Sequence, residues 1–453
     1  MSNLSVLNPM PQHVLIIGGG IGGLCLAQGL KQAGISVAVY ERDRTPTARE
    51  QGYRIHIDPT GSQALHSCLP PALWDAFVFT AGDPGDGFGF LDEKLRKLVL
   101  VEDEIVKGEA NDPAGGHHAV SRLTLRQILL AGLDDVIHFD KEFSRYEQLS
   151  NGRVTAVFTD GTTANGDLLV GVDGANSRVR RQYLPKAERV DTGAVGIGGK
   201  LELNDLSRAW LPNRITNGMN VILGPKHFLF TAIFNRRRKP EEALKLLGDK
   251  VRAAGLDPDQ LFRSLENKDY ILWAFITRRD DHTIEAANGQ GKALQKLVGQ
   301  LIEGWHPDLR KMIVETSTDT IQAFEFKTSV PIKPWESTNV TLLGDAIHSM
   351  TPAGGIGANT ALRDASLLCR KLIGVKQGEH SLVQAIHSYE ALMLEYGFAA
   401  VKDSMRNTKQ ALAGRLARIT GKGFLRLCGA LPPLRRAVFN DRWSDQAREQ
   451  VGQ

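Results

Sequence analysis

Glycines in three widely separated segments have the spacing that lets a backbone approach phosphate groups. The first segment, residues 18–23, reads Gly18-Gly-Gly20-Ile21-Gly22-Gly23 and follows an apolar run. In such a G-x-G-x-x-G turn the first two glycines allow a tight bend close to a pyrophosphate, and the third lets helix and strand pack closely. The helix that begins there directs free N–H groups and the positive end of its dipole at the phosphates.

An acidic residue follows at the distance expected of a ribose-binding carboxylate. Glu41 lies 18 residues after Gly23, at the end of the next apolar run. A carboxylate at this position accepts hydrogen bonds from the ribose hydroxyls of adenosine. Arg42, beside it, could lie over the adenine or meet a phosphate. The alternative is a Rossmann-like turn that binds no nucleotide.

A second acidic residue ends another apolar run and precedes a second glycine-rich turn. Asp345 follows residues 340–344, and the turn reads Pro352-Ala-Gly-Gly355-Ile-Gly357-Ala358-Asn359. A carboxylate there can hold the ribityl hydroxyls of FAD, and the backbone N–H groups of residues 354–359 can face the flavin N1–C2=O edge. The alternative for Asp345 is a helix N-cap. His348 is either a packed helix histidine or a catalytic one.

The third segment lies between these two. Asp173-Gly174 follows an aliphatic run, with Ser177 and Arg180 just beyond. Asp173 can cap the next turn or reach a group near the FAD pyrophosphate, and both interpretations stand. One glycine fingerprint is weak, but three in this order, each after a strand-like run, predict a single FAD site.

Arginines in two further segments are candidates for the same site. Arg122 is predicted to contact the cofactor, and Arg126, one helical turn later, to support it; each could also be a surface residue. Arg54 follows Gly52 and could face flavin or nicotinamide phosphates, whereas Tyr53 and His56 are equally compatible with loop packing. Arg54, His348 and Pro352 are the candidates for catalytic groups near the flavin.

The elements that must position these residues follow from hydrophobic patterning. Residues 14–17 and 37–40 are predicted to be parallel strands buried on both faces, with a helix over 21–32 between them. A helix is expected over 123–131. Residues 153–158 and 167–172 are predicted to form a hairpin around Asp160-Gly161. Residues 195–276 are rich in strand-like runs, and the chain is predicted to be helical after Asp364.

These patterns predict an α/β protein with a Rossmann-like FAD-binding domain of the glutathione-reductase type and an interleaved β-sheet substrate domain. We expect residues 1–190 to form the first part of the FAD-binding domain, with part of the substrate domain inserted near 80–115. Residues 191–290 would form the β-rich substrate domain. Residues 291–400 would complete the FAD-binding domain, and 401–453 a C-terminal basic helical segment.

Composition narrows the classes of function. A net charge of +4 over 453 residues gives no general attraction to nucleic acid. The four cysteines are scattered without C-x-x-C spacing, and His117-His118 has no companion cluster, so neither a disulfide framework nor a metal site is expected. Residues 1–11 show no secretory signal, and no apolar run is long enough to span a membrane, so a cytoplasmic protein is expected.

With these motifs, residues 14–372 resemble the single-component (group A) FAD-dependent aromatic hydroxylases, the group of p-hydroxybenzoate hydroxylase. The tetracycline-inactivating monooxygenase and FAD-dependent epoxidases are similar. The segment from Gly344 to Asn359 is the most specific, and Ile347 stands where relatives commonly have a small residue. The resemblance implies non-covalent FAD, with NADPH or NADH visiting as co-substrate without a dinucleotide domain of its own.

The implied activity is hydroxylation of an electron-rich aromatic or polycyclic small molecule with NAD(P)H and O₂, through a flavin C4a-hydroperoxide protected from water. Alternatives are an epoxidase of an alkene or prenyl substrate, a flavin reductase of the same fold, and a non-catalytic FAD protein that sequesters a ligand or senses redox state. A halogenase is disfavoured because no W-x-W segment occurs. Phe228, Phe230 and Phe234 are candidates for the substrate cavity.

The C-terminal segment differs from the rest of the chain in charge. Residues 404–440 carry eight Lys and Arg residues, no Asp or Glu, and interleaved large apolar residues. This pattern suggests a basic amphipathic helix. One interpretation is weak peripheral contact with an anionic membrane, and the other is a helix packed on the FAD-binding domain with a solvated basic face. A monomer and a homodimer are both compatible with the sequence.

Overall fold

A computed structural model of the chain describes residues 13–46, 48, 52–83, 85–101, 112–263, 265, 268–279 and 291–439. The predictions for residues 1–11, for parts of the segment near 80–115 and for the end of the C-terminal segment lie outside these residues.

A parallel five-stranded sheet forms the centre of the first half of the molecule. Its strand order is β17-β11-β1-β2-β7, and its strands come from distant parts of the chain. Their bounds are β1 Val14–Ile17, β2 Val37–Tyr40, β7 Ile137–His138, β11 Leu168–Gly171 and β17 Val340–Leu342. The first three elements, β1, α1 (Ile21–Gln32) and β2, have the predicted bounds. Short aliphatic strands buried on both faces are typical of parallel sheets covered by helices.

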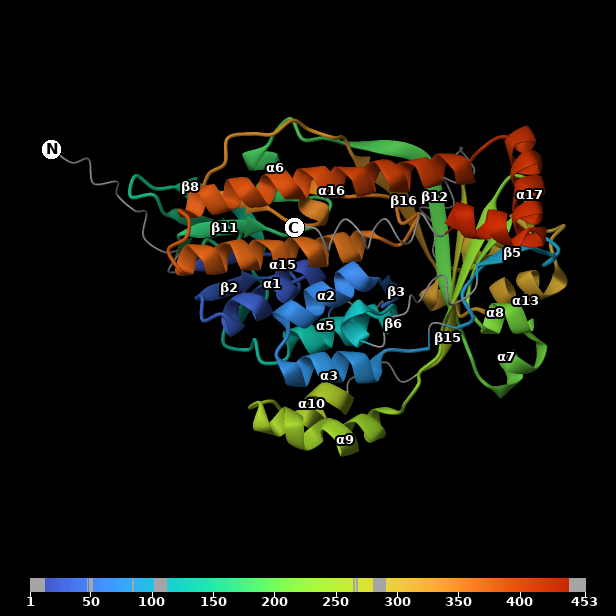
Figure 1. The fold of residues 1–453 in the computed structure, drawn as a ribbon, viewed down its shortest axis with the longest axis horizontal. Helices are drawn as coiled ribbons and strands as arrows, with labels where there is room; N and C mark the ends of the chain where they lie inside the picture. The colour runs from blue at the N-terminus through green and yellow to red at the C-terminus, as the bar shows by residue number, and fades with distance from the viewer. Residues whose placement is uncertain are drawn as a thin grey trace.

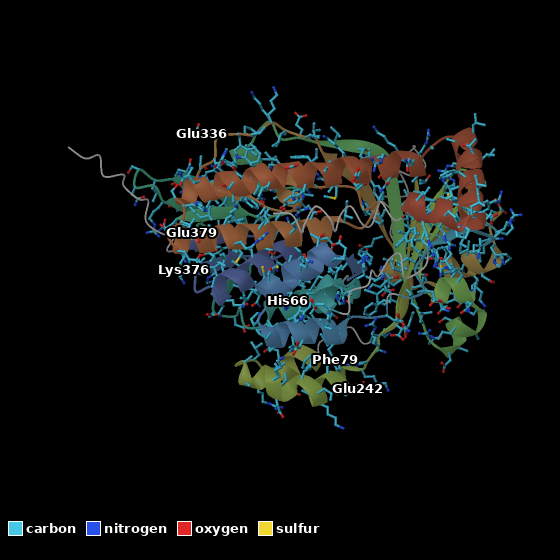
Figure 2. The ribbon with its side chains drawn as sticks, viewed as in Figure 1. His66, Phe79, Glu242, Glu336, Lys376 and Glu379 are labelled. Carbon is cyan, nitrogen blue, oxygen red and sulfur yellow. The ribbon has the colours of Figure 1, made fainter. Side chains whose placement is uncertain are left out.

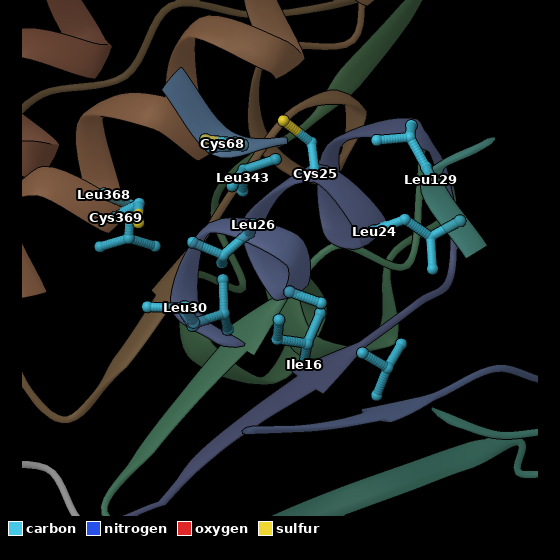
Figure 3. Close-up of a cluster of buried hydrophobic side chains, with 14 of the residues drawn as sticks. Ile16, Leu24, Cys25, Leu26, Leu30, Cys68, Leu129, Leu343, Leu368 and Cys369 are labelled. Atoms are coloured by element: carbon cyan, nitrogen blue, oxygen red, sulfur yellow. The ribbon is translucent and has the colours of Figure 1, made fainter. Parts of the chain in front are cut away.

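Helices from both ends of the chain pack together over this sheet, as Figure 1 shows for α1, α2 and α15. Their bounds are α2 Pro59–Cys68, α3 Pro71–Thr80, α5 Arg122–Leu130, α15 Gly357–Lys376 and α16 Leu382–Ala411. Cys25, Cys68 and Cys369 meet in the core between α1, α2 and α15 (Figure 3), and all four cysteines are free and buried. α1 and α15 approach each other closely here because Gly29 has no side chain. A Cβ on Gly29 would lie only 2.8 Å from the Cys369 sulfur.

The far end of α15 is attached to the end of α1. Lys376, labelled in Figure 2, donates hydrogen bonds to the carbonyl oxygens of Ala33 (2.7 Å) and Gly34 (3.0 Å). A cation near helix C-terminal carbonyls is favourable. On the opposite side of the helical layer, Arg238 lies over the ring of Phe79 and α9 (Pro240–Ala253) packs on α3, with α10 (Pro258–Arg263) beside it (Figures 1 and 2).

The predicted hairpin forms with a different return strand. β9 (Val154–Phe158) pairs antiparallel with β8 (Phe143–Gln148) and with β10 (Thr163–Gly166). Residues 168–171, which we expected to complete the hairpin, are β11 and pair in parallel with β1 and β17. The aliphatic residues 168–171 are buried in the parallel sheet, whereas the more polar residues 163–166 form the partly exposed return strand of the hairpin. A separate two-stranded sheet joins β3 (Arg54–Ile57) to β6 (His118–Ser121).

A seven-stranded sheet forms the other half of the molecule. Its order is β16-β12-β15-β14-β13-β4-β5, antiparallel except for the β13–β4 pair. The bounds are β4 Phe88–Asp92, β5 Lys97–Val101, β12 Arg189–Glu202, β13 Met219–Leu223, β14 Phe228–Phe234, β15 Tyr270–Arg278 and β16 Gln322–Ser329. One face packs on α12 (Gly291–Leu301) and α13 (Pro307–Glu315), with α7 (Asp205–Trp210) and α8 (Asn213–Thr216) at its edge.

The C-terminal segment is not one helix. α16 runs 30 residues across the molecule and ends at Ala411, and a new helix, α17, spans Arg415–Ala430. α17 packs on β5 of the seven-stranded sheet (Figure 1), not on the FAD-binding half as the second interpretation expected. The helix is interrupted at residues 412–414, and this interruption lets α17 leave the direction of α16 and reach the edge of the seven-stranded sheet.

Candidate functional site

One cavity of about 1670 Å³ lies between the parallel sheet and the seven-stranded sheet. Residues of all three glycine-bearing segments line it, together with one face of the seven-stranded sheet. Pockets for single drug-sized ligands usually measure roughly 300–1,000 Å³. This cavity therefore has room for a large cofactor and a second molecule side by side.

The first glycine turn presents open backbone to the cavity. Gly18 has φ +116°, and a Cβ there would lie 2.4 Å from the carbonyl oxygen of Val172. A Cβ on Gly20 would meet no atom within 4 Å, because this residue faces the cavity. No side chain caps the N-terminus of α1, and its first turn contains no acid. Its N–H groups are thus available to an anionic group.

Glu41 is fixed at the end of β2. Its carboxylate accepts hydrogen bonds from the backbone N–H of Gly19 (2.7 Å) and of Asp43 (2.9 Å). The side chain is buried and borders the cavity, and Arg42 beside it is exposed. The two backbone bonds hold the carboxylate in one orientation and leave it acceptor capacity for hydroxyl groups.

The segment around Asp345 contributes a carboxylate and a second open helix end. Asp345 is accessible through the cavity but enclosed by protein on its other sides, and this burial raises the pKa of its carboxyl group against the opposing charges of His348, Arg189 and Arg122. Gly355 has φ +68°, and a Cβ there would again meet nothing. α15 begins at Gly357 with no side-chain cap and no acid in its first turn.

The middle segment joins the other two. Asp173 accepts hydrogen bonds from the N–H groups of Arg178 (2.6 Å) and Val179 (3.3 Å), so one carboxylate oxygen caps α6 (Arg178–Tyr183). Its Oδ1 is buried and has no partner among the described residues. Arg180 donates hydrogen bonds to the carbonyl oxygens of Ala346 (2.7 Å) and Ala175 (3.0 Å) and thereby ties the segment around Asp173 to the segment around Asp345.

Two predicted arginines border the cavity in different ways. Arg122 is exposed towards it. Arg54 is buried in its wall, where Nη1 approaches the sulfur of Met219 at 3.1 Å, and Nε and Nη2 have no partner within the described part of the chain. Burial lowers the pKa of Arg54 to about 10, with Tyr270 acting in the opposite direction. Arg126 instead donates to the carbonyl oxygen of Pro46.

Two half-buried histidines form a pair near Arg54. His56 lines the cavity, and its Nε2 lies 2.9 Å from Nδ1 of His117. Burial, followed by the charge of Arg54, lowers the pKa of His56, and burial lowers that of His117 to about 4. His117 thus has a companion that the sequence did not indicate. The described residues nevertheless contain no group of three or more ligating side chains arranged to hold a metal ion.

The predicted site residues separate into two sets. Those that line the cavity are Gly18, Gly20, Ile21, Gly22, Glu41, Arg42, Arg54, Arg122, Asp173, Asp345, Pro352, Gly355, Gly357 and Ala358. Gly23, Gly52, His348 and Asn359 do not line it. Gly52 packs on Leu123, a Cβ on Gly23 would strike the carbonyl oxygen of Gly18, and Asn359 bonds to the backbone of His56 and Asp58.

His348 belongs to a buried network that holds the turn before Asp345. Its Nε2 lies 2.6 Å from Oδ2 of Asp364, which also accepts the N–H of Gly344 at 2.8 Å; Tyr396 donates to Oδ1 at 2.5 Å. Burial opposes protonation of the imidazole, but the charge of Asp364 and the hydrogen bond to it raise the pKa of His348. Sequence reasoning missed Asp364 because only its distant partners distinguish it from other helix acids.

We expect Asp364→Asn to destabilise the folded protein by about 3 kcal/mol at pH 6, since it leaves a buried imidazolium without its counter-charge. A raised histidine pKa contributes stability below the unfolded pKa of about 6.5, and this contribution is lost as pH rises through the folded pKa. The difference between wild type and variant should therefore shrink towards alkaline pH. Urea denaturation at several pH values measures it, and a pH-independent difference would contradict the charge pairing.

The part of the cavity away from the glycine turns is apolar. Six phenylalanines from the seven-stranded sheet line it: Phe88, Phe90, Phe228, Phe230, Phe324 and Phe326. Of the three phenylalanines proposed for the cavity, Phe234 is not among them and packs on Tyr270 instead. The inner face of α17 covers the same region with Arg418, Lys422 and Leu425.

Within the described ranges, no helix has both the length and the apolar character needed to cross a bilayer.

Comparisons with known proteins show the family to which the chain belongs. Residues 281–404 match the family described as FAD binding domain, and residues 16–78 match the NAD(P)-binding Rossmann-like domain. The dual O-methyltransferase/FAD-dependent monooxygenase elcB of Phaeosphaeria nodorum is 31% identical over 89% of this chain and 46% of its own length. An FAD-dependent monooxygenase of Arthroderma benhamiae is 30% identical over 81% of this chain and 82% of the relative.

Solved structures show the same architecture. The crystal structure of an FAD-containing monooxygenase of Photorhabdus luminescens has a TM-score of 0.74 and 35% identity, and the match covers 88% of this chain and 98% of that one. Zeaxanthin epoxidase of Prunus armeniaca (24% identical) and the tetracycline destructase Tet(51) (TM-score 0.59, 17% identical) are also similar; the latter likeness concerns the fold alone. The chain spans about half the length of elcB and of the other dual enzymes it matches.

Proposed function

Because this chain belongs to the FAD-dependent monooxygenases, we propose that it uses NAD(P)H and O₂ to hydroxylate an electron-rich aromatic or polycyclic small molecule. The observation that carries this proposal is that one continuous cavity is lined by open glycine turns at one end and by six phenylalanines at the other. A cofactor and an apolar substrate can meet there without a channel between them.

The residues at the polar end fit FAD. Gly20 and the uncapped start of α1 offer space and N–H groups to the pyrophosphate, and Glu41 offers acceptors to the adenosine ribose. Asp345 is placed to accept hydrogen bonds from ribityl hydroxyls, and the uncapped start of α15 to face the flavin N1–C2=O edge. When bound, FAD supplies hydride acceptance and activation of O₂.

The apolar end of the cavity accounts for the substrate class. Its phenylalanines provide flat surfaces for an aromatic ring and exclude water from the reacting centre. The name of elcB joins oxygenation to O-methylation, and an O-methyltransferase requires a hydroxyl oxygen on its substrate. Hydroxylated aromatic rings are electron-rich, so this relative favours phenolic substrates and hydroxylation over epoxidation of an isolated alkene.

The proposal is tested with purified protein reconstituted with FAD, supplied with NADPH or NADH and a panel of phenolic polycycles under ¹⁸O₂. We expect substrate-stimulated oxidation of NAD(P)H and a product heavier by one ¹⁸O atom. A product that has gained two hydrogens without ¹⁸O would indicate the reductase alternative. Bound FAD without oxidation of either nucleotide, with every substrate, would indicate the non-catalytic one.

Arg54 has the properties of a residue retained for activity and not for stability. A buried cation whose Nε and Nη2 have no hydrogen-bond partner among the described residues is unfavourable in the folded protein, so Arg54→Met should leave the unfolding temperature unchanged or raise it. We expect kcat/KM to fall by about 10²–10³, the usual effect of removing a preorganised donor. Thermal unfolding and steady-state kinetics measure both effects, with Arg54→Lys as the control that keeps the charge.

Two outcomes separate the possible partners of Arg54. Preserved FAD content with a raised KM for the aromatic substrate would assign the guanidinium to the substrate. Loss of FAD on gel filtration would assign it to the cofactor. Unchanged kinetics and FAD content would contradict any role at the site.

A further inference from the structure

The outer face of α17 carries large apolar side chains that nothing in the described structure covers. We define this outer face as Leu416, Ile419, Phe424, Leu427 and Leu431. These side chains are between 47% and 77% exposed, and they are five of the twelve exposed large hydrophobic residues in the described ranges. The other seven are distributed singly over residues 149–383. Isolated exposed apolar residues are ordinary, whereas a contiguous group marks an interaction surface.

The opposite face of α17 packs against the seven-stranded sheet. Gly429 packs so closely on β5 that a Cβ would lie 2.3 Å from the carbonyl oxygen of Leu98, and Cys428 is buried beside it. Arg418 donates to the carbonyl oxygens of Gly224 and His227, and Lys422 pairs with Glu93 at 2.6 Å. α17 is therefore anchored to the sheet and roofs the cavity, and its outer face cannot turn inward.

Helix geometry puts the outer face in one continuous band. At about 100° per residue, its five members fall within an arc of about 140°, opposite Arg418 and Leu425. Phe424 stands at the edge where this band meets the cavity. Such a wide apolar arc on a helix of low overall hydrophobicity is typical of helices that lie in the plane of a membrane interface.

The charge around the outer face identifies its partner. Residues 404–440 contain eight cations and no acid. Arg426 on the flank of α17 is half exposed, and Lys409 and Arg436 on either side of the helix are exposed. Asp92, which lies 3.5 Å from Arg426, is buried, so the exposed charges named beside the apolar band are positive and complement a surface with negative headgroups above a hydrocarbon layer.

We propose that α17 docks the protein on anionic lipid bilayers, with the apolar outer face inserted and the neighbouring cations against the headgroups. This goes beyond the proposed reaction and does not depend on it. It would place the roof of the phenylalanine-lined cavity against the phase into which apolar molecules partition. A hydrophobic substrate could then enter beside Phe424 without crossing water.

The test is co-sedimentation of the FAD-loaded full chain with vesicles of phosphatidylcholine alone or mixed with phosphatidylserine. We expect preferential pelleting with the phosphatidylserine vesicles, weakened by salt. The triple variant Leu416→Ser/Ile419→Ser/Leu427→Ser should bind these vesicles at least about tenfold more weakly, since each buried methylene contributes roughly 0.8 kcal/mol. None of these three residues lines the cavity.

The matched control is Leu206→Ser/Leu246→Ser/Val314→Ser, three side chains that are 64–82% exposed elsewhere on the surface. It should bind vesicles like wild type, and circular dichroism should show both triple variants folded. Equal pelleting of wild type with and without lipid, or equal binding by both triple variants, would overturn the proposal. So would equal binding to neutral vesicles. A wild-type dimer that the first triple variant converts to a monomer would assign the outer face to a second copy of the chain.

Discussion

A single Gly20→Val substitution is expected to abolish FAD binding while leaving the protein folded. Gly20 has φ −78° and ψ 179°, an extended conformation that valine adopts readily, and a Cβ there meets no protein atom within 4 Å. The added side chain would instead fill the space in which a pyrophosphate approaches the start of α1. We expect FAD affinity to fall by about a hundredfold or more, equivalent to about 3 kcal/mol.

Fluorescence titration with FAD measures this loss, and thermal unfolding of the FAD-free protein measures the fold. Gly304→Val is the matched control, because Gly304 also has open space around it and lies away from the cavity. Gly18→Ala is the contrasting variant: at φ +116°, with a Cβ 2.4 Å from the carbonyl oxygen of Val172, it should unfold the turn itself. Tight FAD binding by Gly20→Val would remove the first glycine turn from the proposed site.

Asp345→Ala is expected to have the second largest effect on FAD. Two hydrogen bonds from ribityl hydroxyls to a carboxylate, at about 1.5–3 kcal/mol each, correspond to a loss of roughly 10²–10⁴ in affinity. The FAD-free variant should be at least as stable as wild type near neutral pH. Burial raises the pKa of Asp345, so the ionised form that predominates at that pH is disfavoured in the empty folded protein.

Isothermal titration with FAD and thermal unfolding at pH 7 measure these two effects together. Asp345→Asn keeps one acceptor oxygen and should give an intermediate affinity. Asp205→Ala, at the start of α7 and outside the cavity, controls for removal of an acid from a helix N-terminus. Unaltered FAD affinity in Asp345→Ala would show that this carboxylate serves the helix and not the cofactor.

Local sequence patterns were sufficient to predict the first βαβ unit and the residues of that unit that line the cavity. β1, α1 and β2 have the predicted bounds because short aliphatic runs and a glycine turn determine them within 30 residues of chain. The Rossmann-like fold class and the FAD-binding domain are confirmed by the structure and the similar proteins.

Features that depend on distant partners could not be predicted. β16 at residues 322–329 pairs with β12 and so joins a sheet that the sequence assigned mainly to residues 195–276, with an insertion near 80–115. The return strand of the hairpin was wrong for the same reason, since β11 gains its pairing from β1 and β17. Likewise, the hydrogen bond from Arg180 to the carbonyl oxygen of Ala346 joins residues 166 positions apart in the chain.

Motif membership also failed to separate residues that face the cavity from residues that shape it. Gly52 and Asn359 belong to the same segments as Arg54 and Ala358, yet Gly52 permits contact with Leu123 and Asn359 fastens β3 to α15. Which side of a turn a residue faces depends on the packing of elements outside the motif. The cofactor contacts assigned to individual residues therefore stay predictions until variants such as Gly20→Val are measured.

The strand order of the parallel sheet has a consequence for biosynthesis. Three neighbouring strands, β1, β11 and β17, pair residue 14 with residue 168 and residue 169 with residue 340, so the sheet joins segments that are far apart in the chain. Such non-local pairing is slow to form. A nascent chain on the ribosome thus lacks β17, Asp345 and the start of α15 until long after β1 and β11 have been made. FAD can use these residues only from that point, and until then the edge of β11 that β17 covers in the folded protein is unpaired.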